Sequence, residues 1–168
     1  MSQPLKTRDI QDLGASDVPF ILLLNNAHAA ETSALDEAGL AALLSMAFYA
    51  RGIDRGATAL LIALDHTASY VNPNFSWFKA HYESFIYIDR VIVSGAARGQ
   101  GLARELYQDL FVAAKQFGHD RVVCEVNIDP PNPISEAFHA TMGFVGVGQA
   151  IIHGGTKSVR YFERSLTR

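Results

Sequence analysis

The sequence is short of several features, and each shortage excludes a class of protein. It has one cysteine, Cys124, in 168 residues, so no disulfide can form within the chain. Its longest apolar runs, residues 20–24 and 57–64, are far shorter than the roughly 20 residues that cross a bilayer. The formal net charge of −3 provides no basic surplus for nucleic acid or for an anionic membrane surface. We therefore expect neither nucleic acid nor a membrane as a partner.

Targeting and linker segments are also missing. The first 14 residues contain no apolar core of the signal-peptide type, and together with the single cysteine this predicts a cytoplasmic, reducing location. No repeat, low-complexity tract or long Ser, Pro or Gly stretch divides the chain. With 49% apolar residues the chain can bury a single core. We expect one domain over residues 1–168.

The first half predicts a short strand, two helices, a hairpin and a long loop. The strand is expected near residues 5–8, the helices over 18–27 after an Asp17 cap and over 33–45, and the hairpin strands over 46–53 and 57–65. Residues 66–84 have no clean period, contain Asn72-Pro73-Asn74 and are rich in aromatic residues. This stretch predicts an aromatic loop that lines a site.

The second half predicts a strand, helix, strand unit, followed by a helix and a closing hairpin. The elements are expected at 85–93, from about 102 to a stop at Gly118, at 121–127, from Asn132-Pro133 to Met142, and at 144–152 and 157–166. Two strands joined by one helix should be parallel, with a right-handed crossover. The expected fold class is α/β: a mixed sheet of about seven strands with four helices.

The junction of that central unit, "VIVSGAARGQGLARELY" from Val91 to Tyr107, predicts an anion site. Several backbone N–H groups lie unpaired at the positive end of a helix that follows a strand. Gly99 and Gly101 have no side chains to hold a ligand away, and Arg98 supplies a countercharge. A glycine-rich turn that only connects the strand to the helix is the other interpretation of an isolated GxG.

Two phosphate-binding motifs can be tested against these letters. A P-loop needs a Lys followed by Ser or Thr where Leu102 and Ala103 stand, so that motif is excluded. A dinucleotide fingerprint needs a third Gly where Arg104 stands, although Glu125 lies at roughly the distance of a ribose-binding carboxylate. Nucleotide or NAD binding is therefore a weak alternative.

The same stretch resembles the acyl-CoA motif of the GCN5-related N-acetyltransferases (GNAT). That pattern is Gln or Arg, any two residues, Gly, any residue, then Gly or Ala, and Arg98, Gly101 and Ala103 satisfy it in order. Downstream, "NPISEAFHATMGF" from Asn132 to Phe144 resembles the family's Asn, a helix with an aromatic pair, and a Gly-Phe that opens the next strand. The resemblance covers almost the whole chain.

The resemblance implies a GNAT-like fold with splayed central strands and an enzyme that moves an acetyl group from acetyl-CoA to a primary amine. The amine is of unknown identity, on a small molecule or a peptide N-terminus, and no metal is implied. The resemblance implies three sets of CoA-binding residues: the backbone of Val91, Ile92 and Val93 along the pantetheine, the turn of Arg98, Gly99, Gln100, Gly101, Leu102 and Ala103 around the pyrophosphate, and Asn132 on the pantetheine. Two residues inserted before Asn132 set this loop apart from the family pattern.

The catalytic residues show the main departure from the family. His139 stands where the family usually places a Tyr that protonates the departing thiolate. It either replaces that acid, packs at a helix–sheet interface or hydrogen-bonds the pantetheine. A backbone N–H near Ile92 or Val93 is the expected oxyanion donor. Asp89 and Glu125, in the two central strands, are candidate general bases, or else ordinary ion-paired carboxylates.

The acceptor site is expected at the loop from Asn25 to Ser33 and among the aromatic residues. Asn26, His28 and Glu31 could contact an acceptor amine, although helix capping and solvation explain them equally well. Trp77 and Tyr82 could line the pocket or belong to the core. A non-catalytic acyl-CoA-binding or regulatory module is the alternative function, and a homodimer through the edge of the terminal strand is left open.

Overall fold

The computed structural model describes residues 9–167 and contains one seven-stranded sheet. The strands lie in the order β1-β2-β3-β4-β5-β7-β6, and β4 and β5 are the parallel pair while the other neighbours are antiparallel. Their bounds are β1 Gln11–Asp12, β2 Tyr49–Ile53, β3 Ala59–Asp65, β4 Ile86–Val93, β5 Arg121–Asp129, β6 Val145–Ile152 and β7 Lys157–Ser165. The predicted mixed α/β class with a central βαβ unit is confirmed. The strand expected near residues 5–8 lies outside the described residues.

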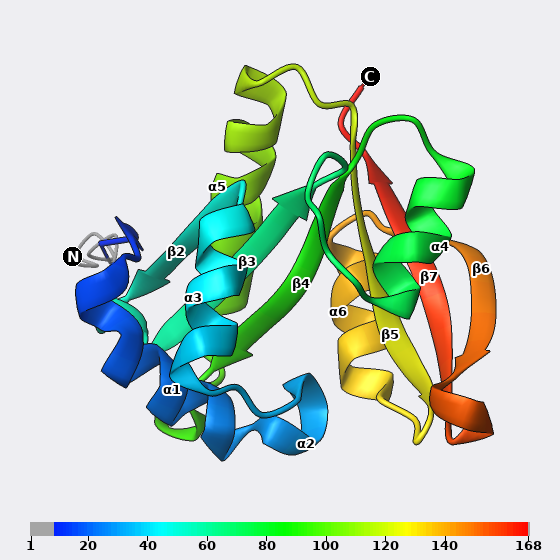
Figure 1. The fold of residues 1–168 in the computed structure, drawn as a ribbon. Coiled ribbons are helices and arrows are strands. Elements are labelled where there is room, and N and C mark those ends of the chain that lie inside the picture. Colours follow the sequence, from blue (N-terminus) through cyan, green and yellow to red (C-terminus); the bar gives the residue numbers. More distant parts are fainter. Residues whose placement is uncertain (1–8, 168) are drawn as a thin grey trace, which may run out of the picture.

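The described residues form six α-helices, two more than expected. They are α1 Val18–Ala27, α2 Ala29–Thr32, α3 Glu37–Met46, α4 Pro73–His81, α5 Leu102–Gln116 and α6 Pro133–Thr141. Helices α1, α3 and α4 cover one face of the sheet, and α5 and α6 cover the other (Figure 1). Each layer has its own apolar core: Leu40, Phe75 and Phe78 belong to the first, and Leu106, Tyr107 and Phe144 to the second.

Helix α4 corrects the prediction of a long aromatic loop. The Asn72 side chain accepts hydrogen bonds from the backbone of Asn74 and Phe75, and Pro73 occupies the first helical position. This is the same Asn-Pro start that marks α6. The helical period is obscured because α4 buries aromatic residues on more than one side, with Trp77 stacked 4.2 Å from the Tyr161 ring.

The terminal hairpin also differs from the expectation in one respect. Strand β7 lies between β5 and β6, so both of its edges are paired. The terminal strand therefore has no free edge for the homodimer contact that the sequence left open, and the free edge of this side of the sheet belongs to β6.

The parallel strands β4 and β5 separate after a short paired region. Ile86 pairs with Val122 and Tyr87 with Val123, and beyond this point the two strands diverge (Figure 1). A register shift in the β3–β4 ladder makes Asp89 the extra residue of a β-bulge. The strands thus open a gap in the sheet directly after the bulge.

The register shows which backbone groups of β4 face that gap. Ser94 N donates to Thr58 O of the β3 side, and because antiparallel pairs alternate, Ile92 also directs its backbone groups toward β3. Val91 and Val93 consequently direct theirs toward the gap. Of the three valine and isoleucine residues expected along the pantetheine, these two have the orientation for backbone pairing.

Candidate active site

A cavity of about 320 Å³ passes through the gap and is lined from both faces of the sheet. Asn74, Tyr87 and Glu125 line it on the α4 side, and Tyr107 and His139 line it on the side of α5 and α6. A ligand in this cavity would therefore touch residues of both layers. The splayed strands make this connection, since a fully paired sheet would separate the layers.

Glu125 is a cavity carboxylate with strongly perturbed acidity. Its Oε1 accepts a hydrogen bond of 2.9 Å from the Tyr87 hydroxyl, and its Oε2 is shielded from solvent without a hydrogen bond of good geometry among the described residues. Burial raises the pKa of Glu125 to about 7, although the Tyr87 hydrogen bond opposes the rise. A carboxyl group with this pKa can accept a proton near neutral pH.

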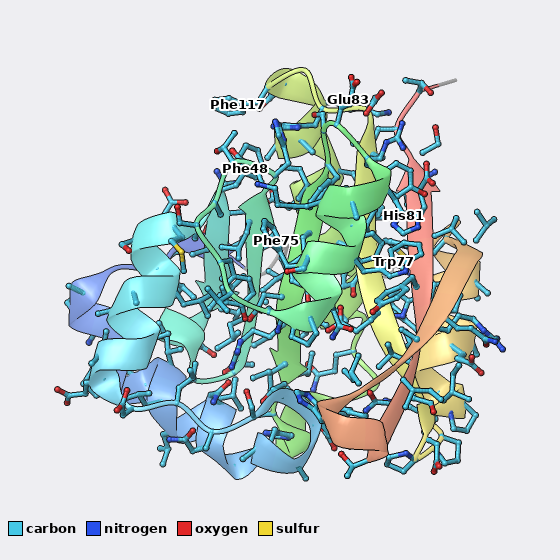
Figure 2. All side chains as sticks on the ribbon, turned by 45° about the vertical axis from the view of Figure 1, so that its right-hand side comes forward. Phe48, Phe75, Trp77, His81, Glu83 and Phe117 are labelled. Atoms are coloured by element: carbon cyan, nitrogen blue, oxygen red, sulfur yellow. The ribbon has the colours of Figure 1, made fainter. Side chains whose placement is uncertain are left out.

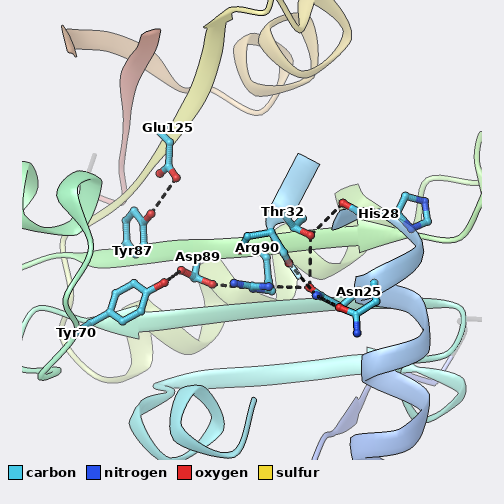
Figure 3. A network of polar contacts seen from close by, with 10 residues as sticks. Asn25, His28, Thr32, Tyr70, Tyr87, Asp89, Arg90 and Glu125 are labelled. Carbon is cyan, nitrogen blue, oxygen red and sulfur yellow. Dashed lines mark hydrogen bonds and ion pairs between the residues drawn. The ribbon is translucent and has the colours of Figure 1, made fainter. Parts of the chain in front are cut away.

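Asp89, the other candidate base, is fully engaged by its neighbours (Figure 3). Its Oδ2 lies 2.7 Å from Arg90 Nε in an ion pair whose side chains are 3% and 5% exposed, and its Oδ1 accepts from the Tyr70 hydroxyl. Since both oxygens are occupied and the charge is compensated, Asp89 is suited to holding structure rather than to moving protons. We therefore favour Glu125 as the base.

Arg90 also connects this ion pair to the loop after α1. Its Nη1 donates to Asn25 Oδ1 over 2.6 Å, and Asn25 in turn donates to Ser33 O (Figure 3). The network fixes α2 beside the cavity entrance, where Glu31 and Thr32 line the cavity. The loop is thus positioned by buried polar contacts rather than by apolar packing.

The expected acceptor residues of this loop divide into two groups. Glu31 lines both the cavity and a neighbouring groove, and His28 lines the groove. Asn26 lines neither, because its side chain closes the loop through hydrogen bonds with both backbone groups of Leu35. The structure thus brings Glu31 and His28 to the site and gives Asn26 a structural role.

The aromatic candidates lie away from the cavity. Trp77 packs between α4 and the final hairpin, stacked on His81 (Figure 2). The Tyr82 hydroxyl donates to Glu163 over 2.6 Å, and Arg121 lies over its ring. We leave both residues out of the proposed site.

His139 is buried on α6, and both of its ring nitrogens have partners. Nδ1 lies 2.7 Å from the carbonyl oxygen of Ser135, and Nε2 lies 2.8 Å from the Tyr107 hydroxyl. Burial lowers the pKa of His139, which the Ser135 contact partly offsets. Burial thus favours the neutral form of the imidazole in the cavity wall.

A groove of about 600 Å³ adjoins the cavity and shares Val91, Asn132 and His139 with it. The predicted turn residues Arg98, Gly99, Gly101, Leu102 and Ala103 line this groove. Gln100 belongs to the same turn, with its exposed side chain outside the groove lining.

The turn is built in a way that suits an anionic ligand. Gly99 and Gly101 have φ values of +79° and +76°, and a Cβ on either would meet nothing within 4 Å. Gly101 is the N-cap of α5 and no side chain caps this end, so the first-turn N–H groups open toward the groove. The glycines therefore satisfy a backbone requirement and also leave a cradle that a phosphate could fill. Asn132 caps α6 through Ser135 N, which sets its side chain beside the same groove.

Three of the residues described above were missed by sequence reasoning. Tyr107 was assigned only to the helix, Tyr70 was included only as part of the aromatic loop, and Arg90 received no role. Period-3.6 spacing marks Tyr107 as buried but does not show that its hydroxyl reaches a gap in the sheet. The only sequence signal for Arg90 is that it and Asp89 form a charged pair in the middle of an otherwise mostly apolar strand.

Comparison with known proteins identifies the family. Residues 66–144 match the family model of the acetyltransferase (GNAT) family. These residues form a GNAT acetyltransferase domain. GNAT acetyltransferases are enzymes that use acetyl-CoA, and the predicted family is confirmed. No curated protein resembles the chain closely enough to count as a relative.

Solved structures share the GNAT fold over nearly the whole chain. The ribosomal-protein-S18-alanine N-acetyltransferase of Escherichia coli is 16% identical with a TM-score of 0.70, covering 95% of this chain and 94% of its own. Ard1 of Thermoplasma volcanium is 14% identical with a TM-score of 0.70, covering 95% and 98%. The NatC complex bound to Gag peptide and CoA is also 14% identical with a TM-score of 0.70, covering 95% and 98%. At these identities the likeness concerns the fold.

Residues 9–167 contain no group of three or more His, Cys, Asp or Glu side chains placed to hold a metal ion. Within the same residues, no helix is long and apolar enough to cross a membrane.

Proposed function

We propose that this protein transfers an acetyl group from acetyl-CoA to a primary amine of a small molecule or a peptide N-terminus. The observation that carries the proposal is the cavity through the sheet, with Glu125 on one wall and His139 on the other. The groove at the start of α5 continues from this cavity and suits an anionic cosubstrate. An acyl donor and an amine could thus meet between the two layers.

Glu125 is assigned as the general base that takes a proton from the acceptor ammonium. At pH 7 an amine of pKa about 10.4 is neutral only about once in 2,500, a penalty near 4.6 kcal/mol, whereas an α-amine of pKa about 7.7 is neutral roughly one time in six. A carboxyl group with a pKa of about 7 is half ionised there and can serve either acceptor. Glu31 lies at the cavity entrance, where it would contact the acceptor, and His28 lies in the adjoining groove.

Backbone N–H groups of β4 are assigned to the acyl oxygen. Val91 and Val93 direct theirs into the gap, and such fixed donors stabilise developing negative charge without reorganisation. Arg98 and the first turn of α5 would hold the pyrophosphate of acetyl-CoA. When bound there, acetyl-CoA would supply the activated acetyl carbon. Of the two expected oxyanion donors, the N–H of Val93 is retained, and the N–H of Val91 takes the place of that of Ile92.

Direct transfer is favoured over a route through an acetylated cysteine. Cys124 lines the cavity, but burial raises the pKa of its thiol well above the ordinary range. A protonated thiol is a poor nucleophile. The single cysteine therefore has no assigned step in the reaction. The cytoplasmic location expected from the sequence stays a prediction.

The test is turnover against a panel of amines, measured by release of the CoA thiol. The panel contains peptides with different N-terminal residues, lysine-like amines and small aromatic and aliphatic amines, with acetyl-CoA as donor. We expect at least one class to accelerate thiol release in the wild type and not in Glu125→Gln. Binding of acetyl-CoA without acceleration by any amine would instead favour the non-catalytic acyl-CoA-binding module. Competition by NAD for the same groove would favour the dinucleotide alternative.

A further inference from the structure

One polar group in the cavity wall has no role in the proposed reaction: the hydroxyl of Tyr107. The residue is 1% exposed, and its ring is surrounded by the edges of Phe111, Phe138 and Phe144. A phenylalanine would satisfy that apolar packing equally well. The hydroxyl nevertheless lies at the cavity, 2.8 Å from His139 Nε2.

The contacts of His139 determine how this hydrogen bond is arranged. The carbonyl oxygen of Ser135 can only accept, so Nδ1 carries a proton and donates it over 2.7 Å. In the neutral ring Nε2 is then an acceptor, and the Tyr107 hydroxyl is the donor. His139 therefore has no free N–H to offer to a group in the cavity.

Protonation of the imidazole reverses this hydrogen bond. Nε2–H then donates to the Tyr107 oxygen, and the hydroxyl hydrogen is released toward the cavity while Nδ1 keeps Ser135. Every polar atom of the pair retains a partner if an anion accepts from the hydroxyl. The pair is thus built to deliver a proton through Tyr107 rather than from the imidazole directly.

We propose that Tyr107 is a further catalytic residue, which relays a proton from His139 Nε2 to the departing sulphur of CoA. This inference rests on the proposed function, because it assumes that acetyl-CoA enters the gap between β4 and β5. The acid hydroxyl is thus placed on α5, whereas the family pattern predicts it at position 139 on α6. The base, Glu125, lies on the opposite face of the same cavity.

The relay leaves both residues chemically balanced. As the carbon–sulphur bond breaks, its electron pair stays on sulphur, and the sulphur takes the hydroxyl proton of Tyr107. The proton on His139 Nε2 moves at the same time to the phenolic oxygen, so Tyr107 is neutral before and after. The neutral imidazole regains a proton from solvent, to which Glu125 returns the proton of the amine. No phenolate forms, which matters because burial raises the pKa of Tyr107 well above that of a thiol.

The test uses a readout that needs no acceptor amine: the titration of the thiol of bound CoA. Thiolate formation is followed by ultraviolet absorbance, as the difference from the complex with desulfo-CoA, which lacks the sulphur. In the wild type the bound thiol should titrate at lower pH than free CoA, because the relay stabilises the thiolate by a charge-assisted hydrogen bond. Tyr107→Phe should reduce the thiolate fraction about tenfold at fixed pH.

Two variants separate the relay from a structural effect. Tyr49→Phe is the matched control, since Tyr49 is also buried and bonded through its hydroxyl, to Asp109, but does not line the cavity. It should leave the titration of bound CoA unchanged. His139→Gln keeps an amide beside the hydroxyl and removes the ionisable ring. It should therefore abolish the shift in the titration of bound CoA, as Tyr107→Phe does. The variant with both substitutions should lose no more than either single variant.

The outcomes separate the proposed role of Tyr107 from the proposed function. A bound thiol that titrates identically in the wild type and Tyr107→Phe, with CoA affinity and thermal midpoint preserved, would overturn the role of Tyr107 and leave the acetyltransferase proposal intact. Failure of wild-type protein to bind CoA would overturn both. If Tyr107→Phe folds poorly, an unshifted titration in folded His139→Gln would still overturn the relay.

Discussion

The two faces of the sheet meet in one cavity but carry different chemistry. On the face of α1 and α4, Asp89, Arg90 and Glu125 are charged or titratable, and the first two compensate each other. On the face of α5 and α6, Tyr107 and His139 form a neutral hydrogen-bonded pair surrounded by phenylalanine rings. Burial shifts the pKa values on the two faces in opposite directions: it raises the pKa of Glu125 and lowers that of His139. Both shifts favour the neutral form of the group, because burial disfavours charge.

Glu125→Gln should have the largest effect and would remove the base from the charged face. We expect kcat/KM for an amine of high pKa to fall 10²- to 10⁴-fold, the usual loss for a general base. In the wild type the rate should decrease as pH falls through about 7, where Glu125 gains its proton, and the variant should lack this limb. Steady-state kinetics across pH check this, and an unchanged profile in the variant would assign the base elsewhere.

The same substitution should stabilise the fold above neutral pH. A carboxyl whose pKa is raised in the folded state contributes fully below its unfolded value of 4.5 and loses that contribution as pH rises to about 7. Gln does not ionise, so the variant avoids this loss. Its gain in the free energy of unfolding over the wild type should be absent near pH 4.5 and reach at most about 3 kcal/mol above pH 7. Urea unfolding at both pH values measures it, and equal gains at both would contradict the assignment.

Arg90→Leu tests the compensated pair on the charged face. Removing one partner of a buried ion pair leaves Asp89 uncompensated, which typically costs about 3–5 kcal/mol in the free energy of unfolding. Arg160→Leu is the control, because its pair with Glu136 is 45% and 36% exposed and should contribute about 0–1 kcal/mol. Equal losses in urea unfolding would show that the Asp89–Arg90 pair is not a special feature of this face.

His139→Phe probes the neutral face. Turnover should fall roughly 10- to 100-fold with little loss of acetyl-CoA affinity, because the ring acts on proton delivery rather than on binding. Burial lowers the pKa of His139, and the protonated fraction of the ring shrinks as pH rises above that pKa. The difference in turnover between the variant and the wild type should therefore narrow as pH rises. Kinetics that match the wild type from about pH 6 to pH 9 would remove His139 from the mechanism.

Arg98→Ala should have the smallest effect and concerns the groove that both faces adjoin. Loss of a charge-assisted contact to phosphate should raise the Kd of acetyl-CoA about tenfold with kcat unchanged. Lys115→Ala, at the other end of α5, is the matched control and should leave Kd unchanged. Titration calorimetry measures both, and an equal effect of the two variants would reduce Arg98 to a contribution of net charge.

Local patterns predicted much of this molecule. Asn132-Pro133 and Gly118 mark helix ends that the structure confirms, and the βαβ unit was inferred from element order alone. The same Asn-Pro start at residues 72 and 73 was overlooked, since aromatic residues buried on several sides of α4 conceal its period. The groove residues were found because phosphate binding by a helix end depends on consecutive backbone groups, which a sequence displays directly.

What the sequence by itself determined is most of the elements, their order and the glycine turn at the start of α5, because these follow from contacts within a few residues. Only the tertiary structure decided that burial raises the pKa of Glu125 to about 7 and that a buried arginine pairs with Asp89, because the two carboxylates do not differ in these respects as letters. It also decided that Tyr107 and His139, 32 residues apart, share a proton contact. Burial and pairing are properties of surroundings assembled from distant segments, and for that reason no local pattern encodes them.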